Sequence, residues 1–153
     1  MEEVLPEGAE RDFTATSYIL EDGKVLLIDH EKLGMWIPPG GHVEEDEMPH
    51  ETARRETLEE TGIKVEFQER PETGYEEESY DLPRPFNINL HRIKENHWHC
   101  DFAFRARKTG ETEASHSEEH NGTRWFTEED LESESFKMPE NIRKTCLRIL
   151  REE

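Results

Sequence analysis

The sequence predicts an α/β domain, because strand-like segments lie on both sides of one short helix and an amphipathic helix follows them. Residues 13–20 are rich in β-branched and aromatic types, and Asp22-Gly23 then offers the chemistry of a tight hairpin turn into a partner strand at residues 25–28. Residues 97–107 alternate between apolar and polar side chains, as a half-buried strand does.

The short helix is bracketed by Pro49, which suits a first helical turn, and by Gly62, which suits a C-terminal cap. Within it Glu56, Glu59 and Glu60 fall inside about one hundred degrees of arc, so three carboxylates share one face. Like charges at this spacing repel one another, so the face is either solvated or neutralised by a cation. Carboxylate oxygens suit Mg2+ or Mn2+, and we therefore interpret the helix as metal-binding.

Residues 41–63 resemble the Nudix box, a motif in which glycine, glutamate and arginine residues stand at fixed spacing. The matching positions are Gly41, Glu47, Arg55, Glu56, Glu59, Glu60 and Gly62, followed by the apolar Ile63. Thr57 stands where an aliphatic residue is usual, which affects packing more than chemistry. The sequence from Trp36 to Gly41 also resembles the family's approach to the box, with Pro39 in place of a frequent glycine. The competing interpretation is a solvated acidic helix that fits the pattern by chance.

The resemblance implies a Nudix-type α/β/α sandwich, with a mixed β-sheet between the box helix and the C-terminal helix. It also implies hydrolysis of a pyrophosphate bond in a nucleoside diphosphate linked to another moiety, with Mg2+ or Mn2+ as the cofactor. Glu56, Glu59 and Glu60 would hold the cations together with the backbone of Gly41, which has no side chain to block a metal. In this family an acidic residue in the loop before a Trp-Phe strand often joins the site, and the spacing favours Glu119.

The roles within this site are partly open. Glu118 stays an alternative to Glu119, and both could be solvated loop acids. Arg55 and Glu47 are assigned to a structural salt bridge that keeps the box loop against the helix, because a guanidinium does not titrate. The general base must reach the attacking water, which leaves Glu56 and Glu119 as candidates.

Residues 68–96 have an irregular pattern with several prolines, so we expect a long loop that carries substrate specificity. The alternative is a solvated connection. Arg84 and Phe86 stand beside prolines in this segment and could offer a guanidinium and a ring to a substrate. Phe86 is equally compatible with core packing.

The strand expected at residues 97–107 has two distinct faces. Its apolar face carries Trp98, Cys100, Phe102, Phe104 and Ala106. On the polar face, His99 and Asp101 are expected to line the substrate cleft. Together with His97 they could instead form a transition-metal site, because alternate residues of a strand lie side by side.

The last part of the chain carries two further helix signals. Thr127 offers an N-cap three residues before Asp130, and Pro139 opens a final helix. The apolar residues of that helix form one stripe, namely Ile142, Cys146, Ile149 and Leu150. We expect the stripe to pack on the domain, with Cys146 as a small core residue rather than a reactive thiol.

Composition limits the class of protein. The chain has 153 residues, with 19 Lys and Arg against 38 Asp and Glu and a formal net charge of -19. We expect one domain over residues 1–153, with residues 1–12 as an N-terminal arm. The acidic balance argues against direct affinity for nucleic-acid backbones and leaves salt adaptation as an option. With no membrane-length apolar run, no export signal and no cysteine framework, we expect a cytoplasmic protein with reduced thiols.

An enzyme is favoured over a catalytically silent Nudix-fold module that senses a nucleotide or binds a protein, because all the metal-site glutamates of the box are present. A calcium-binding EF-hand is disfavoured, since the alternating Asp and Asn of such a loop are missing. The small-molecule substrate is open among damaged nucleoside triphosphates, ADP-ribose, nucleotide sugars and dinucleoside polyphosphates. The oligomeric state is open too, a homodimer included.

Overall fold

The computed structural model of the protein describes residues 4–69, 77–110 and 120–153. Within these residues the strands are β1 (Glu10–Glu21), β2 (Lys24–His30), β3 (Met35–Ile37), β4 (Gly40–His42), β5 (Val65–Phe67), β6 (Asn87–Lys94), β7 (His97–Lys108) and β8 (His120–Phe126). The helices are α1 (Pro49–Thr61), α2 (Glu128–Glu132) and α3 (Glu140–Arg151). None of these helices is both long enough and apolar enough to cross a membrane.

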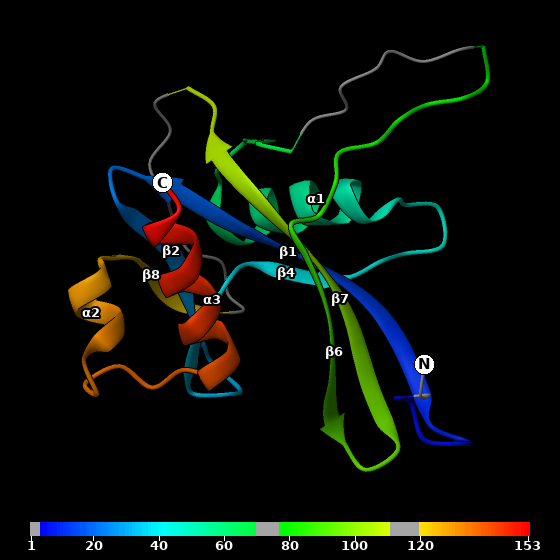
Figure 1. The fold of residues 1–153 in the computed structure, drawn as a ribbon, viewed down its shortest axis with the longest axis horizontal. Helices are drawn as coiled ribbons and strands as arrows, with labels where there is room; N and C mark the ends of the chain where they lie inside the picture. Colours follow the sequence, from blue (N-terminus) through cyan, green and yellow to red (C-terminus); the bar gives the residue numbers. More distant parts are fainter. Residues whose placement is uncertain (1–3, 70–76, 111–119) are drawn as a thin grey trace.

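The strands form one mixed sheet with β1 near its middle (Figure 1). β1 runs parallel to β7 along most of its length and antiparallel to β4 and β2 on its other side. β7 pairs in turn with β5 and β6, and β2 pairs with β3 and β8, all antiparallel. β1 therefore connects the two halves of the sheet and positions the short strand β4.

Both faces of the sheet are covered, each by its own hydrophobic core. Along β1 the side chains alternate, so that Ala15 and Ile19 enter the core under α1 whereas Tyr18 and Leu20 enter the core under α2 and α3. The α1 core consists of Ala15, Ile19, Leu26, Ala53, Ile63, Val65, Phe67, Phe104 and Ala106. The opposite core consists of Tyr18, Leu20, Val25, Leu27, Ala103, Phe126, Leu131, Met138, Cys146, Ile149 and Leu150. The predicted α/β/α sandwich with a mixed sheet is therefore confirmed.

Local signals in the sequence set several boundaries correctly. Asp22 and Gly23 have φ values of 49° and 74° and form the turn between β1 and β2. α1 begins at Pro49, and Gly62 ends it in the left-handed region, where its N–H donates to the Leu58 carbonyl at 2.9 Å. The predicted helix of residues 49–61 is confirmed.

The C-terminal helices also follow their sequence signals. Thr127 and Asp130 form a reciprocal capping box at the start of α2. Pro139 precedes α3. The apolar stripe of α3 lies against the core that contains Phe126. Burial raises the pKa of the Cys146 thiol to about 12, which agrees with a core role and keeps the thiol protonated.

Two expectations about segment boundaries were wrong. Residues 87–94, expected within the 68–96 loop, form β6, which pairs with β7 over its whole length. Their side chains are mostly half-buried or exposed, so the hydrophobic alternation that would identify a strand is weak. β1 begins at Glu10, so residues 10–12 belong to the sheet rather than to the N-terminal arm, because they pair with the first residues of β7.

The expected half-buried character of β7 holds for only part of the strand. Ala103 is buried in the α2–α3 core and its neighbour Phe104 in the α1 core. The middle of β7 is covered on both faces, because helices lie on both sides of the sheet at this point.

Candidate active site

The glycine-rich approach to α1 is held tightly on β1. Gly40 and Gly41 in β4 pair with Thr16 and Ala15, and the Ser17 N–H donates to the Pro39 carbonyl at 3.0 Å. A β-carbon at Gly40 would lie 2.4 Å from the Ala15 carbonyl oxygen. Only glycine therefore allows β4 to approach β1 this closely.

Gly41 lies equally close to the first carboxylate of α1. A β-carbon at this position would lie 2.5 Å from both Cδ and Oε1 of Glu56. The Glu56 carboxylate thus occupies the space that a side chain at position 41 would need, and the Glu56 side chain is 17% exposed. The Glu56 carboxylate of α1 therefore lies close to the Gly41 backbone of β4.

The three glutamates of α1 differ in their environment. Glu60 is only 6% exposed, and the Gly40 N–H donates to its Oε1 at 3.3 Å. The Glu59 side chain, by contrast, is 59% exposed. Glu56 and Glu60 therefore face the glycines of β4, whereas Glu59 borders the same site from the solvent side.

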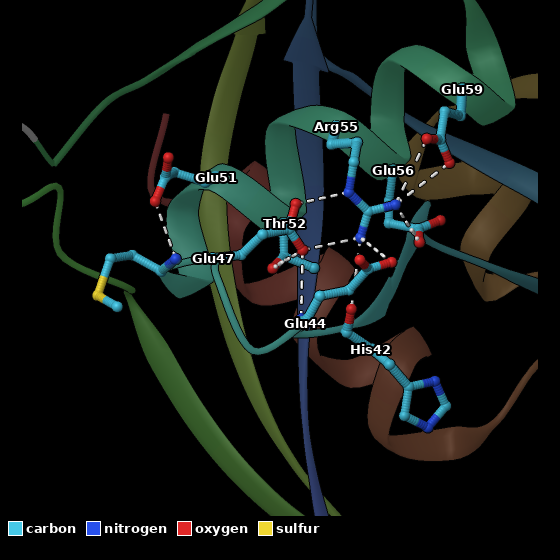
Figure 2. Close-up of polar contacts among 9 residues, drawn as sticks. His42, Glu44, Glu47, Glu51, Thr52, Arg55, Glu56 and Glu59 are labelled. Carbon is cyan, nitrogen blue, oxygen red and sulfur yellow. Dashed lines mark hydrogen bonds and ion pairs between the residues drawn. The ribbon is translucent and has the colours of Figure 1, made fainter.

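Arg55 forms hydrogen bonds and ion pairs with several surrounding carboxylates, as Figure 2 shows. Its Nε and Nη2 bind the two oxygens of Glu47 at 2.6 and 2.9 Å, so this ion pair is bidentate. Its Nη1 donates to Glu56 Oε1 at 3.0 Å and reaches Glu59 Oε2 at 3.3 Å. The structure thus contains the Arg55–Glu47 pair expected from the motif, and one guanidinium also neutralises part of the charge on α1.

The ion pair shifts the pKa values of both partners. Hydrogen bonding from Arg55 holds the pKa of Glu47 down to about 2, and the Thr52 hydroxyl, which donates to Glu47 Oε1 at 2.9 Å, contributes in the same direction. Glu47 in turn raises the pKa of Arg55 further above its usual range. The pair is therefore fully charged at neutral pH.

The buried side of α1 is held by hydroxyl groups. Thr57, the departure from the aliphatic position of the motif, is fully buried and donates from Oγ1 to Ser17 Oγ at 2.9 Å. Ser17 Oγ donates onward to the Ala53 carbonyl at 3.3 Å. Thr57 thus affects packing, as expected, but through a hydrogen bond to β1. Ser17 was not singled out from the sequence, because nothing local marks its partner forty residues away.

Asp101 is occupied by contacts within the sheet. Its two carboxylate oxygens accept hydrogen bonds from the hydroxyls of Thr14 and Thr16, each at 2.8 Å. Burial raises the pKa of Asp101, and the two threonine hydrogen bonds oppose that shift. Asp101 lies on the sheet face that also carries Tyr18, opposite the face covered by α1.

His99 lies on the same face as Asp101, two residues earlier on β7. Burial and, to a smaller extent, the neighbouring His42, His91 and His97 together lower the pKa of His99 to about 4. The imidazole of His99 is therefore neutral at physiological pH. Neither His99 nor Asp101 is on the α1 face that carries Glu56.

Phe86 and Arg84 are the other residues expected to contact a substrate. Phe86 packs edge-on against Tyr18 with ring centroids 5.4 Å apart, and the guanidinium groups of Arg105 and Arg148 lie 5.5 and 5.6 Å from its centroid. Phe86 thus belongs to packing on the α3 side of the sheet. Arg84 is exposed, and its backbone N–H donates to the Glu69 carbonyl at 2.9 Å. Glu118 and Glu119 lie outside the described residues.

A cavity of about 480 Å³ lies on the other flank of α1. Its walls include His50 and Arg54 of α1 together with Phe67, Tyr80, Leu82 and Pro83. His50 and Arg54 are on the opposite side of the buried stripe from Glu56 and Glu60, so the cavity does not coincide with the carboxylates.

The fold and the site together define an α/β/α sandwich domain in which a glycine-rich strand meets a helix bearing three carboxylates. The family model of the NUDIX domain matches residues 11–149. The chain therefore belongs to the Nudix family.

Similar proteins agree with this assignment. A structure of a NUDIX-family hydrolase from Clostridium perfringens has a TM-score of 0.79 at 30% identity, covering 93% of this chain and 97% of that one. A MutT protein from Methanosarcina mazei has a TM-score of 0.71 at 21% identity, covering 94% and 96%, which shows a shared fold. A MutT-like protein of Streptomyces ambofaciens is 47% identical over 51 residues, and the uncharacterized Nudix hydrolase YvcI of Bacillus subtilis is 41% identical over 51. These two alignments span about a third of each relative, 33% and 32% of their lengths.

Proposed function

We propose that this chain hydrolyses a pyrophosphate bond in a small molecule containing a nucleoside diphosphate linked to another moiety. The contact between Gly41 and the Glu56 carboxylate carries the proposal. At this contact the acidic face of α1 meets a glycine, whose backbone has no side chain to cover it. Membership of the Nudix family supports the same reaction.

The residues fit Mg2+ or Mn2+. The ligands on offer are oxygens only, from the Gly41 backbone and from Glu56, Glu59 and Glu60, with Glu119 added from the sequence motif. The Glu56 carboxylate fills the space beside Gly41 that a β-carbon would need, which supports a cation held jointly by Glu56 and the Gly41 backbone. When bound, such an ion neutralises the diphosphate, polarises phosphorus and lowers the pKa of the attacking water.

The remaining roles belong to the chain's own side chains. Arg55 holds the box loop against α1 through its bidentate bond to Glu47, and so keeps Glu56 in position. Glu56 or Glu119 accepts the proton of the attacking water on a carboxylate oxygen. The segment of residues 68–96, with β6 at its end, is the part proposed to select the moiety attached to the diphosphate.

The experiment is a substrate panel assayed for phosphate release after phosphatase coupling, with Mg2+ and with Mn2+. The panel contains oxidised nucleoside triphosphates, ADP-ribose, nucleotide sugars and dinucleoside polyphosphates. We expect turnover of at least one class by the wild type, abolished by excess EDTA and restored by added Mg2+, and no turnover by Glu60→Gln. Full turnover in excess EDTA would contradict the metal requirement. Tight nucleotide binding without turnover of any panel member would favour the catalytically silent module.

A further inference from the structure

We propose that Asp12, His42 and His99 form a second metal site, built for a divalent transition metal such as Zn2+ and separate from the carboxylates of α1. One ligand atom from each of these three residues lies within 4.8 Å of the other two. Among the described residues, this group draws one side chain from each of three strands, β1, β4 and β7.

Strand register explains why the three side chains meet. In the sheet, Asp12 of β1 pairs with His99 of β7, and Thr14 of β1 pairs with His42 of β4. Asp12 and Thr14 are two residues apart and therefore point to the same face, which places His42 and His99 on that face as well. Because β1 lies between β4 and β7, its carboxylate lies between the two imidazoles.

The distances are close to those of a coordinated ion. Zn2+ binds imidazole nitrogen and carboxylate oxygen at about 2.0–2.1 Å, so neighbouring ligand atoms in a tetrahedral site are about 3.3 Å apart. His42 Nε2 already lies 3.3 Å from Asp12 Oδ2. The rings of His42 and His99 are edge-to-face with centroids 5.0 Å apart, so small side-chain rotations bring the third nitrogen into range.

His97 also contacts the Asp12 carboxylate. Its Nε2 lies 3.1 Å from the same Oδ2 of Asp12, and its ring centroid is 5.3 Å from that of His99. Partners that orient a metal-binding carboxylate in this way strengthen the site. Of the alternative set His97, His99 and Asp101, only His99 belongs to this group. The hydroxyls of Thr14 and Thr16 occupy Asp101, so Asp12 supplies the carboxylate and His42 the second imidazole.

The two sites differ in ligand chemistry and in position. Imidazole nitrogen suits Zn2+, Co2+, Ni2+ and Cu2+, whereas an oxygen-only site suits Mg2+ and Mn2+. His42 directly follows Gly41, yet its side chain points to the opposite sheet face, and Figure 2 shows its ring turned away from Glu56. The side chains of Asp12 and His42 are 43% and 62% exposed, so an ion can enter from solvent. Two imidazoles and one carboxylate leave a fourth position for water or another ligand.

The test is calorimetric titration of the full chain with Zn2+ in a large excess of Mg2+, together with the visible spectrum of bound Co2+. We expect one equivalent of Zn2+ and the intense absorption of tetrahedral Co2+. Asp12→Asn and His99→Ala should each weaken Zn2+ binding by at least about 10-fold. His50→Ala, a matched control on the far flank of α1, and Glu56→Gln should both keep wild-type Zn2+ affinity.

The melting temperature of every variant is measured beside its titration. If His99→Ala destabilises the sheet, Asp12→Asn still tests the site, because it preserves the side-chain shape at a partly exposed position. Unchanged Zn2+ affinity in a folded Asp12→Asn variant would overturn the proposal. Loss of Zn2+ binding in Glu56→Gln but not in Asp12→Asn would overturn it too, because the ion would then be in the carboxylate site. Neither result depends on whether the chain hydrolyses pyrophosphate.

Discussion

The Glu56 carboxylate fills the space beside Gly41, where a β-carbon would be 2.5 Å from its Oε1. Real β-carbons do not approach an oxygen this closely, so any residue larger than glycine at position 41 would force the Glu56 carboxylate to move. This constraint explains why the motif needs a glycine well before its Arg-Glu pair, even though Gly41 does not require a positive φ.

Gly41→Ala should therefore displace the Glu56 carboxylate and lower kcat/KM. A displacement of about 1 Å at a catalytic group commonly costs on the order of 100-fold in rate. The measurement is kcat/KM together with Mn2+ affinity, and both should fall.

A second glycine variant provides the control. Gly34 has a φ of 61°, but a β-carbon added there would meet no atom within 4 Å, so Gly34→Ala should cost about 1 kcal/mol in unfolding free energy through backbone strain. Its kcat/KM should stay at the wild-type value. Equal kinetic losses in the two variants would mean that the Gly41 contact has no specific role.

The parts of this structure that the sequence predicts are those with local signals. Pro49 and Gly62 delimit α1 because each acts on its own backbone, and Asp22-Gly23 forms its turn for the same reason. The spacing of Arg55 and Glu47 likewise determines a contact across one loop and one helical turn.

The parts that the sequence does not predict depend on pairing between distant segments. β6 has little hydrophobic alternation, and only its pairing with β7 identifies it as a strand. Asp12, His42 and His99 come from three strands, and only their register brings them together. In isolation each is an ordinary polar residue on a strand, so no single stretch of sequence predicts that the three side chains meet.

Arg55→Ala should lower both the melting temperature and the activity. The Glu47 side chain is only 13% exposed and would lose its charged partner. Because hydrogen bonds to charged groups contribute about 1.5–3 kcal/mol, the free energy of unfolding should fall by about this amount. Arg54→Ala is the matched control, since the Arg54 guanidinium lies 5.2 Å from the Phe67 ring centroid, on the flank of α1 that borders the cavity. Lost activity at unchanged stability would replace the structural role with a direct substrate contact.

Glu47 should also make the stability of the fold depend on acidity. Arg55 lowers the pKa of Glu47 from 4.5 to about 2, so between these values the folded state holds this group unprotonated whereas the unfolded state is protonated. Its contribution is therefore complete above the unfolded pKa and is lost as the pH falls from 4.5 toward 2. The free energies of unfolding of the wild type and Glu47→Gln should differ at neutral pH and converge across this window. A constant difference would contradict the assignment.

Glu56→Gln and Glu119→Gln should separate metal binding from proton transfer. Glu56 lies beside Gly41 and one helical turn from Glu60, so the two carboxylates can hold one cation. Glu56→Gln should therefore weaken Mn2+ affinity and turnover together. Glu119 is supplied by a different segment, and Glu119→Gln should keep the tightest Mn2+ while slowing the chemical step by about 100- to 10,000-fold. The measurement is Mn2+ titration beside kcat for both variants. Near-normal kcat in Glu119→Gln at saturating Mn2+ would show that Glu119 is not the base, and Glu56 or another glutamate of the motif would then take that role.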